Sequence, residues 1–336
     1  MEETGRRSVR CAVLGSPIRH SISPVLHSAA YAALGLTWWR YTAIECDEAG
    51  LPGFLDRCGP DWAGLSLTMP LKRAVLPLLD RVEPLAVRVG GANTVLLTPG
   101  SRLGYNTDVP GMVRALAEHG IGPAVGRGTD PAAAAKPDIA AAVSAGRIEG
   151  PPVPANGMGA VAAPEGAGVT LAGAEPVLIL GAGATASAAL AALADLGQTT
   201  IAVAARDPAR TRDLRAAAER IGVRVELRPF TPAAATATPM VVSTVPAGAA
   251  APFASAFTNP ATTTPSALFD VIYDPWPTPL AAAATKAKAT VVNGFDLLLH
   301  QAAAQVELFT GRPAPLDAMR QAGRAELTRR GHESGA

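Results

Sequence analysis

The chain has 336 residues, enough for two domains that each bury a core of their own. Its formal net charge of +1 provides no overall field that would favour nucleic acid or an anionic membrane as a partner. The apolar runs are too short to span a bilayer, the first residues lack the apolar core of a signal peptide, and the 3 cysteines show no CxxC spacing. We therefore expect a cytoplasmic protein that binds neither metal, nucleic acid nor membrane.

The first hundred residues alternate short apolar runs with helical patterns. A helix is expected after the first run, with Ser23 as its N-cap and Pro24 in its first turn. Strands that alternate with helices indicate an α/β layer with a largely parallel sheet. We expect these strands at residues 10–15, 39–44, 62–67 and 94–97, the last of them turning at Pro99-Gly100.

Residues 121–170 differ in composition from the rest of the chain. Ala, Gly and Pro supply 30 of these 50 residues, and none of the 50 is aromatic. Such a segment buries too little apolar surface to offset the entropy that is lost on ordering. We expect a flexible insertion without catalytic residues here, between an N-terminal domain over residues 8–111 and a second domain over residues 174–293.

A glycine-rich loop follows the first strand of the second domain. The apolar run at residues 177–180 leads directly into Gly181-Ala182-Gly183-Ala184-Thr185-Ala186 and then into an alanine-rich helix that ends near Gly197. In this GxGxxA pattern the first glycine permits a tight turn, and the second lets the backbone approach a pyrophosphate at the helix N-terminus. Because it lies between a strand and a helix, the loop indicates a Rossmann-type dinucleotide-binding domain rather than an ordinary turn. Further strands are expected at residues 200–204, 240–242, 267–272 and 290–292.

The segment after residues 200–204 decides between the two dinucleotides. A carboxylate there binds the ribose 2′-hydroxyl of NAD, whereas an arginine suits the 2′-phosphate of NADP. The sequence offers Arg206 and Arg210, whose guanidinium groups match a phosphate, but it also has Asp207. Asp207 either favours NAD or caps the helix that follows. We expect NADP, with NAD the less favoured cofactor.

Two short segments upstream of the glycine loop each carry one acid–base group. Lys72 ends the run TMPLK, and Asp108 ends the run GYNTD, where a helix is expected to begin. Brought together, a lysine and an aspartate can move a proton while a bound nucleotide moves a hydride, which indicates an enzyme; the alternative is a surface ion pair. Ser21 and Ser23 form a natural cradle for a small carboxylate, unless Ser23 only caps its helix.

In the glycine loop, the two serines and the segments of Lys72 and Asp108, the chain resembles the shikimate dehydrogenase family. The resemblance covers nearly the full length apart from residues 121–170. Ser66 departs from the asparagine that is usual in the family, and Asp296 and Leu297 replace a usual Gly-Met pair. The matching segments, in order, are residues 15–27 (GSPIRHSISPVLH), 64–72 (GLSLTMPLK), 91–94 (GANT), 104–108 (GYNTD), the glycine loop, 273–275 (YDP) and 293–302 (NGFDLLLHQA).

The resemblance implies a fold and a set of roles. The fold would be an α/β substrate domain, a Rossmann-type NADP-binding domain and a C-terminal helix, residues 294–325, that returns to the N-terminal domain. Lys72 would be the acid–base group, paired with Asp108. Substrate contacts are implied for Ser21, Ser23 and Tyr273 at a carboxylate, and for Thr68, Asn93, Asp108 and Gln301 at ring hydroxyls. Cofactor contacts are implied for Gly181, Gly183, Ala184, Thr185, Arg206, Arg210, Thr244 and Gly294.

The implied activity is the reversible, NADPH-dependent reduction of 3-dehydroshikimate to shikimate by a monomer or homodimer. Two alternatives remain open. The substrate could be quinate or an amino-substituted relative, with NAD as the cofactor. The protein could also be a non-catalytic, shikimate-binding sensor, although a pure binder has no need for the Lys72 and Asp108 pair.

Overall fold

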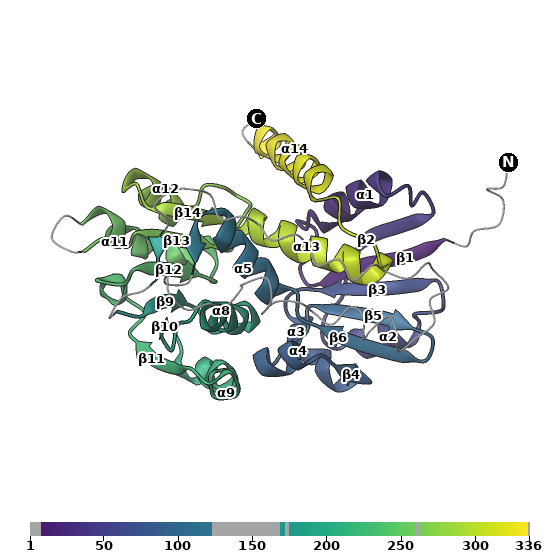
Figure 1. Cartoon of the computed structure of the whole chain (residues 1–336), viewed down its shortest axis with the longest axis horizontal. Helices are drawn as coiled ribbons and strands as arrows, with labels where there is room; N and C mark the ends of the chain where they lie inside the picture. Colours follow the sequence, from purple (N-terminus) through teal and green to yellow (C-terminus); the bar gives the residue numbers. More distant parts are fainter. Residues whose placement is uncertain (1–7, 123–168, 172–174, 260–262, 335–336) are drawn as a thin grey trace.

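Two α/β domains make up the computed structural model, which describes residues 8–122, 169–171, 175–259 and 263–334 (Figure 1). Each domain is built on a six-stranded sheet, so the predicted fold class is confirmed. None of the helices in these ranges is long and apolar enough to cross a membrane.

Most of the expected flexible insertion lies outside the described residues, but its two ends belong to the fold. β7 (Ile121–Gly122) pairs in parallel with β8 (Val169–Thr170). The Ile121 side chain is fully buried, in a core cluster that also contains Leu171. The folded part of the chain therefore reaches into residues 121–170 from both sides, further than composition predicts.

The N-terminal sheet is mixed, and the prediction of a largely parallel sheet is wrong for its second half. β1 pairs in parallel with β2 and β3, but β5 runs antiparallel to both β3 and β6. For β5 and β6 the cause is the turn at Pro99-Gly100, with Gly100 at φ +77°, because a connection this short can join only antiparallel neighbours. Across the sheet the order is β2-β1-β3-β5-β6-β4, with β1 (Val9–Gly15), β2 (Trp39–Glu45), β3 (Trp62–Leu67), β4 (Arg81–Val82), β5 (Thr94–Thr98) and β6 (Ser101–Tyr105).

The first helix begins at Ser23, and the prediction that Ser23 is its N-cap is wrong. Ile22 occupies the N-cap position, and no side chain caps the helix. Instead, the backbone N–H of Ser23 donates to Ser21 Oγ at 3.3 Å. The Ser23 hydroxyl therefore remains available for other partners. The helices of this domain are α1 (Ser23–Ala33), α2 (Leu51–Asp56), α3 (Leu71–Ala74) and α4 (Pro84–Val89), with a 3-10 turn at Leu76–Leu78.

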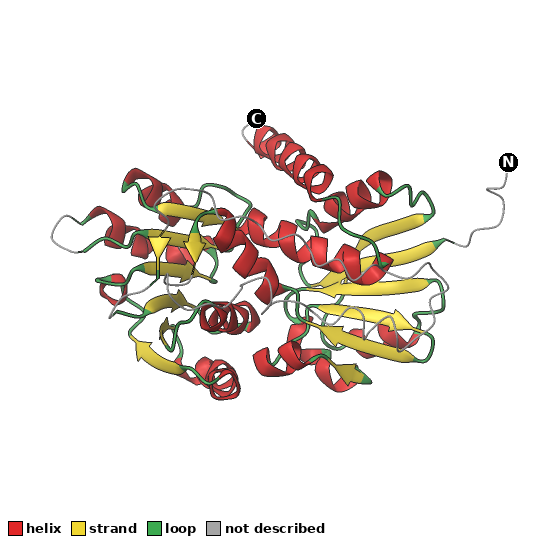
Figure 2. Cartoon of the chain, in the orientation of Figure 1, coloured by secondary structure: helices red, strands yellow, loops and turns green. Residues whose placement is uncertain are grey.

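The second sheet is parallel throughout, and its order β11-β10-β9-β12-β13-β14 is that of a Rossmann fold. Apolar side chains pack on both of its faces, which are covered by helices (Figure 2). Strands buried on both faces appear in a sequence as continuous apolar runs, which is why five of these six strands are predicted; β11, a half-exposed strand at the edge of the sheet, is not. Its strands are β9 (Val177–Leu180), β10 (Thr200–Ala204), β11 (Arg224–Arg228), β12 (Met240–Ser243), β13 (Ala267–Asp270) and β14 (Thr290–Asn293).

The order of the strands reverses between β9 and β12, which opens a crevice beyond their carboxyl ends, where such sheets bind ligands. The glycine-rich loop lies there, between β9 and α8. The helices of this domain are α8 (Ala184–Asp195), α9 (Arg212–Ile221), α10 (Ala247–Ala250), α11 (Ser255–Thr258) and α12 (Pro279–Lys286), with 3-10 turns at Pro208–Thr211, Pro232–Ala235 and Ala251–Ala254.

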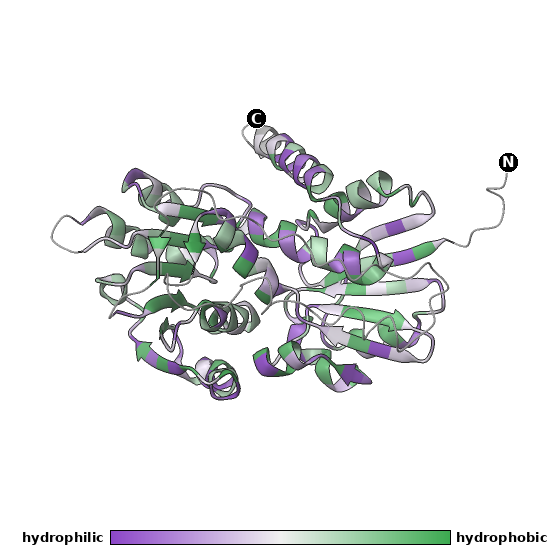
Figure 3. Cartoon of the chain, viewed as in Figure 1, coloured by the Kyte–Doolittle hydropathy of each residue, from purple (hydrophilic) through white to green (hydrophobic). Residues whose placement is uncertain are grey.

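Two long helices connect the domains. α5 (Asp108–Glu118) leads away from the first sheet, α13 (Gly294–Thr310) leads back to it, and the two pack against each other at the centre of the molecule (Figure 1). α14 (Leu316–Ser334) then packs on α1, so the predicted return to the N-terminal domain is confirmed. The predicted single helix over 294–325 is two helices, because Gly311 at φ +66° ends α13. Hydrophobic residues follow the strands of both sheets, whereas α14 carries many hydrophilic ones (Figure 3).

Candidate active site

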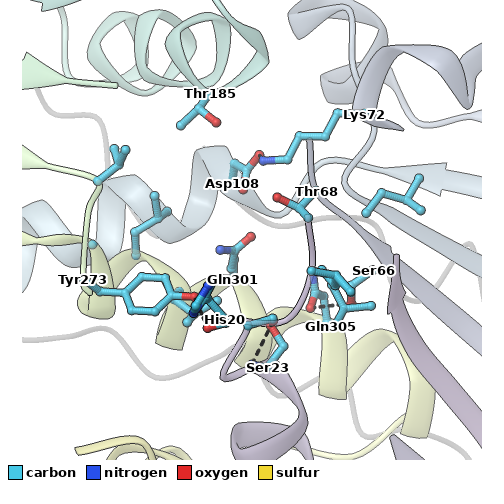
Figure 4. A pocket seen from close by; sticks show the side chains of 18 of the residues that line it. His20, Ser23, Ser66, Thr68, Lys72, Asp108, Thr185, Tyr273, Gln301 and Gln305 are labelled. Carbon is cyan, nitrogen blue, oxygen red and sulfur yellow. Dashed lines mark hydrogen bonds and ion pairs between the residues drawn. The ribbon is translucent and has the colours of Figure 1, made fainter. Parts of the chain in front are cut away.

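A cleft of about 260 Å³ lies between the two domains, large enough for one small molecule. The structure brings together in its walls nine of the residues singled out from the sequence. They are Ser21, Ser23, Thr68, Lys72, Asp108, Thr185, Tyr273, Gly294 and Gln301, most of which are labelled in Figure 4.

The Lys72 and Asp108 side chains meet in this cleft. Lys72 Nζ donates to Asp108 Oδ2 at 2.6 Å, and the two side chains are 13% and 2% exposed. Asp108 is the first residue of α5, where the helix dipole stabilises a negative charge. Its backbone N–H donates to Asn106 Oδ1 at 3.1 Å, which holds the start of the helix in place. A proton donor is thus fixed beside its counter-charge at the edge of the cleft, unlike the exposed surface pair of the alternative interpretation.

Asn93 lies behind this pair rather than in the wall of the cleft. Its side chain is fully buried, and Nδ2 donates to Asp108 Oδ1 at 2.9 Å and to Gln301 Oε1 at 3.0 Å. Its Oδ1 accepts the backbone N–H of Thr107 at 2.8 Å. Both of its N–H groups are therefore used within the protein, and Asn93 orients Asp108 and Gln301.

Several polar groups in the cleft have no protein partner. Among the described residues, no hydrogen bond is made by the hydroxyls of Ser23 and Thr68 or by the amide nitrogen of Gln301. Buried and half-buried polar groups are normally paired, so groups left open in a cleft are those that a polar ligand can satisfy. Their arrangement around Lys72 fits a small molecule with several oxygen atoms.

One end of the cleft is formed by the Ser21 loop and by Tyr273 of the second domain. Tyr273 Oη donates to the backbone oxygen of His20 at 3.4 Å, and burial raises the pKa of Tyr273, so that the phenol remains a donor. Arg330 of α14 donates from Nη1 to the same oxygen at 2.8 Å. The last helix therefore braces the end of the cleft where hydroxyl donors gather.

The opposite side of the cleft is formed by the glycine-rich loop. Gly181 has φ +109°, and an added Cβ would lie 2.5 Å from Thr244 Oγ1, so only glycine allows this turn. Gly183 is the N-cap of α8, with Ala184 and Thr185 in its first turn, and Thr185 lines the cleft. Gly294 comes so close to the Val271 carbonyl that no side chain fits there. These features suit a pyrophosphate at the N-terminus of α8.

Arg206 lies apart from this cleft, in a shallow hollow beyond β10 that Arg228 and Phe230 also line. The structure does not bring Arg210 into that hollow: its exposed side chain lies 3.9 Å from Asp207. Asp207 Oδ1 accepts the backbone N–H of Ala209 at 2.9 Å, so Asp207 acts as a cap, one of its two predicted roles. In the part of the chain that the structure describes, no three His, Cys, Asp or Glu residues are grouped to hold a metal ion.

Comparison with known proteins identifies the family. Residues 13–95 match the model of the shikimate dehydrogenase substrate binding domain, and residues 294–322 match that of the shikimate 5'-dehydrogenase C-terminal domain. The shikimate dehydrogenase (NADP(+)) of Geobacter metallireducens is 30% identical over 98% of this chain and 100% of its own length. This chain belongs to the shikimate dehydrogenase family.

Two solved structures show how widely the family fold extends. Shikimate dehydrogenase of Mycobacterium tuberculosis is 39% identical, with a TM-score of 0.72 over 94% of this chain and 99% of that chain. Quinate dehydrogenase from Corynebacterium glutamicum in complex with NAD is 24% identical and shares the fold, with a TM-score of 0.68 over 95% of this chain and 100% of that chain. Because the second structure holds NAD, the fold alone does not select the cofactor.

Three residues of this family member escaped the sequence analysis. Gln305 lines the floor of the cleft, Arg228 lines the hollow at Arg206, and Arg330 braces the end at His20. None of them stands in a glycine, proline or acid–base motif. Only the fold brings them to the site, since Arg330 lies 310 residues from its partner His20.

Proposed function

We propose that this protein catalyses the reversible, NADP-linked interconversion of shikimate and 3-dehydroshikimate. The observation that carries the proposal is the Lys72 and Asp108 pair, 2.6 Å apart, between hydroxyl donors on one side and the glycine-rich loop on the other. That arrangement supplies the parts that an alcohol dehydrogenation needs: a grip on the substrate, a proton-transfer group and a dinucleotide site.

The substrate carboxylate would bind between Ser21, Ser23 and Tyr273. Hydroxyl groups can donate to a carboxylate, and hydrogen bonds to a charged group are stronger than those to a neutral one. Ser23 carries an unused hydroxyl because it does not cap α1. The ring hydroxyls would then face Thr68, Asp108 and the open amide nitrogen of Gln301, with Asn93 holding the latter two in place.

The proton in this reaction belongs to Lys72. When bound, NADPH supplies a hydride to the C3 carbonyl carbon of 3-dehydroshikimate. Lys72 gives a proton to the oxygen that becomes the new alcohol, and Asp108 holds the ammonium group in place during this step. In the reverse direction Lys72 takes up the proton of the alcohol, and because oxidation releases a proton overall, it should be favoured as the pH rises.

NADP is the cofactor that the residues favour. The glycine-rich loop and the N-terminus of α8 fit a dinucleotide, with Thr244 close against Gly181. Arg206 would meet the adenosine 2′-phosphate from its place in the hollow beyond β10, which Arg228 also lines. One oxygen of the Asp207 carboxylate accepts the backbone N–H of Ala209, so this side chain is engaged as a cap and is less suited to the ribose hydroxyl of NAD.

The proposal is tested by mixing the protein with shikimate and NADP⁺ and recording the absorbance of NADPH. Shikimate should be oxidised with a kcat/KM in the ordinary enzymatic range, about 10⁴–10⁸ M⁻¹ s⁻¹. Better turnover of quinate, or of NAD⁺ in place of NADP⁺, would instead support the alternative dehydrogenase. Binding of shikimate without any turnover would identify a sensor.

A further inference from the structure

Gln305 lies on α13, one helical turn beyond Gln301, and its side chain reaches the floor of the cleft (Figure 4). It is only 3% exposed. Its Oε1 accepts from Ser66 Oγ at 2.8 Å and lies 3.3 Å from His27 Nε2. All the hydrogen-bonding positions of its carboxamide are occupied within the protein, because the two N–H groups are also used.

The hydrogen bonds to Oε1 fix which way the carboxamide points. Burial lowers the pKa of His27 to about 3, so the ring is neutral, and the tautomer with its proton on Nε2 is the one that can donate to Oε1. The ring is also stacked on Tyr41, with centroids 3.8 Å apart. Tyr41 Oη donates to Ser66 at 2.7 Å, which leaves the Ser66 proton for Gln305. The amide nitrogen of Gln305 must therefore point the other way.

That nitrogen donates to two threonine hydroxyls, and these two hydroxyls in turn orient the side chain of Asn93. Gln305 Nε2 donates to Thr94 Oγ1 at 3.2 Å and to Thr107 Oγ1 at 3.3 Å. The two hydroxyls lie 3.3 Å apart, and because each accepts from Gln305, neither has to donate to the other. Their protons go to Asn93 Oδ1, at 3.0 Å and 3.1 Å. With the backbone N–H of Thr107 this gives Asn93 Oδ1 three donors.

These hydrogen bonds form one continuous series in which each group donates to the next, from the core beside α1 to the acid–base pair. Because three donors fix the position of Asn93 Oδ1, its Nδ2 faces Asp108 and Gln301. We propose that Gln305 is a positioning residue for the proposed dehydrogenase reaction, on which this inference rests. It acts through Thr94 and Thr107 to hold Asn93 against Asp108. It differs from Gln301, whose amide nitrogen is open to the cleft.

The first test is Gln305→Met, which keeps the length of the side chain and removes both ends of the carboxamide. We expect kcat to fall roughly 10- to 100-fold, the range for a lost network contact to a charged group, while KM for shikimate changes less than about threefold. The matched control is Gln198→Met, which removes a single bond to the Leu171 carbonyl in the second domain and should leave both constants near the wild-type values. A kcat within about twofold of wild type, whatever the melting temperature, would show that Gln305 is only a structural brace.

A second variant, Thr94→Val with Thr107→Val, keeps Gln305 and removes its link to Asn93. It should reproduce the loss in kcat. Adding Gln305→Met should then lower kcat little further, because the effects of substitutions within one hydrogen-bond network are not additive. Independent, multiplying losses would overturn the inference. The NMR signal of the Asn93 side-chain amide reports on the same hydrogen-bond link and can be measured without turnover. If wild type fails to oxidise shikimate, the proposed function fails, but a shifted Asn93 signal in both variants still supports the inference, and an unchanged signal overturns it.

Discussion

Replacing Lys72 with Met tests the acid–base assignment, because it keeps most of the side-chain stem and removes Nζ. A general acid contributes about 10²- to 10⁴-fold to the rate, so kcat should fall by that factor. The substitution also leaves the Asp108 carboxylate, which is 2% exposed, without its counter-charge, and among the described residues it then keeps only the Asn93 N–H at 2.9 Å. Removing one partner of a buried pair costs about 3–5 kcal/mol of unfolding free energy, and we expect the lower end because the cleft admits water.

The loss of activity must be separated from the loss of stability. Lys72→Met combined with Asp108→Asn removes the stranded charge, so the free energy of unfolding should recover while kcat stays low. Arg73→Met is the matched control: Arg73 pairs with Asp213 at 2.8 Å on an exposed surface, and its loss should cost less than about 1 kcal/mol. Turnover is followed by NADPH absorbance, stability by denaturant unfolding and shikimate binding by calorimetry. If Lys72→Met kept more than about a tenth of the wild-type kcat, the assigned role would be wrong.

Three further predictions follow from single contacts. Ser23→Ala should raise KM for shikimate about 10-fold and leave the melting temperature unchanged, since Ser23 caps nothing; a fallen melting temperature with unchanged KM would contradict this. Arg206→Ala should lower kcat/KM for NADP roughly 10- to 100-fold and leave NAD kinetics alone; equal losses with both cofactors would refute the 2′-phosphate contact. Burial raises the pKa of Glu118, but the nearby His300 ring and the Arg320 guanidinium, which donates to Glu118 at 2.7 Å, outweigh it and lower that pKa to about 2. Glu118→Gln should therefore lower the melting temperature by roughly 2–4 °C at neutral pH, with the difference vanishing as the pH falls towards 2, and a constant difference would argue against the ion pair.

Five of the six strands in the Rossmann half of the molecule could be predicted because they carry their own signal, whereas the half-exposed edge strand β11 could not. β9 and β10 are buried on both faces and are therefore continuous apolar runs, and the glycine loop between β9 and α8 has a fixed pattern. The second half of the first sheet could not. β6 (Ser101–Tyr105) contains Ser, Arg and Gly, shows no alternation, and becomes a strand through its pairing with β5 on one side and β4 on the other.

The residues of the site likewise divide into those that local sequence motifs predict and those that only the fold brings together. Lys72 and Asp108 belong to short local motifs from which the sequence predicts an acid–base pair, and the structure places their side chains 2.6 Å apart. Ser23 was misassigned as a cap because a serine before Pro24 matches the usual pattern, whereas the loop geometry starts the helix one residue earlier. Gln305 gave no signal, because its partner His27 lies 278 residues away and the role exists only in the packed structure.

The most direct measurement is the steady-state oxidation of shikimate by the wild-type protein with NADP⁺ and with NAD⁺, recorded across a range of pH. We predict turnover that is faster with NADP⁺ and increases as the pH rises, because oxidation of the alcohol releases a proton. No reduced nicotinamide from either cofactor, despite measurable binding of shikimate, would contradict the assignment of this cleft as a dehydrogenase active site.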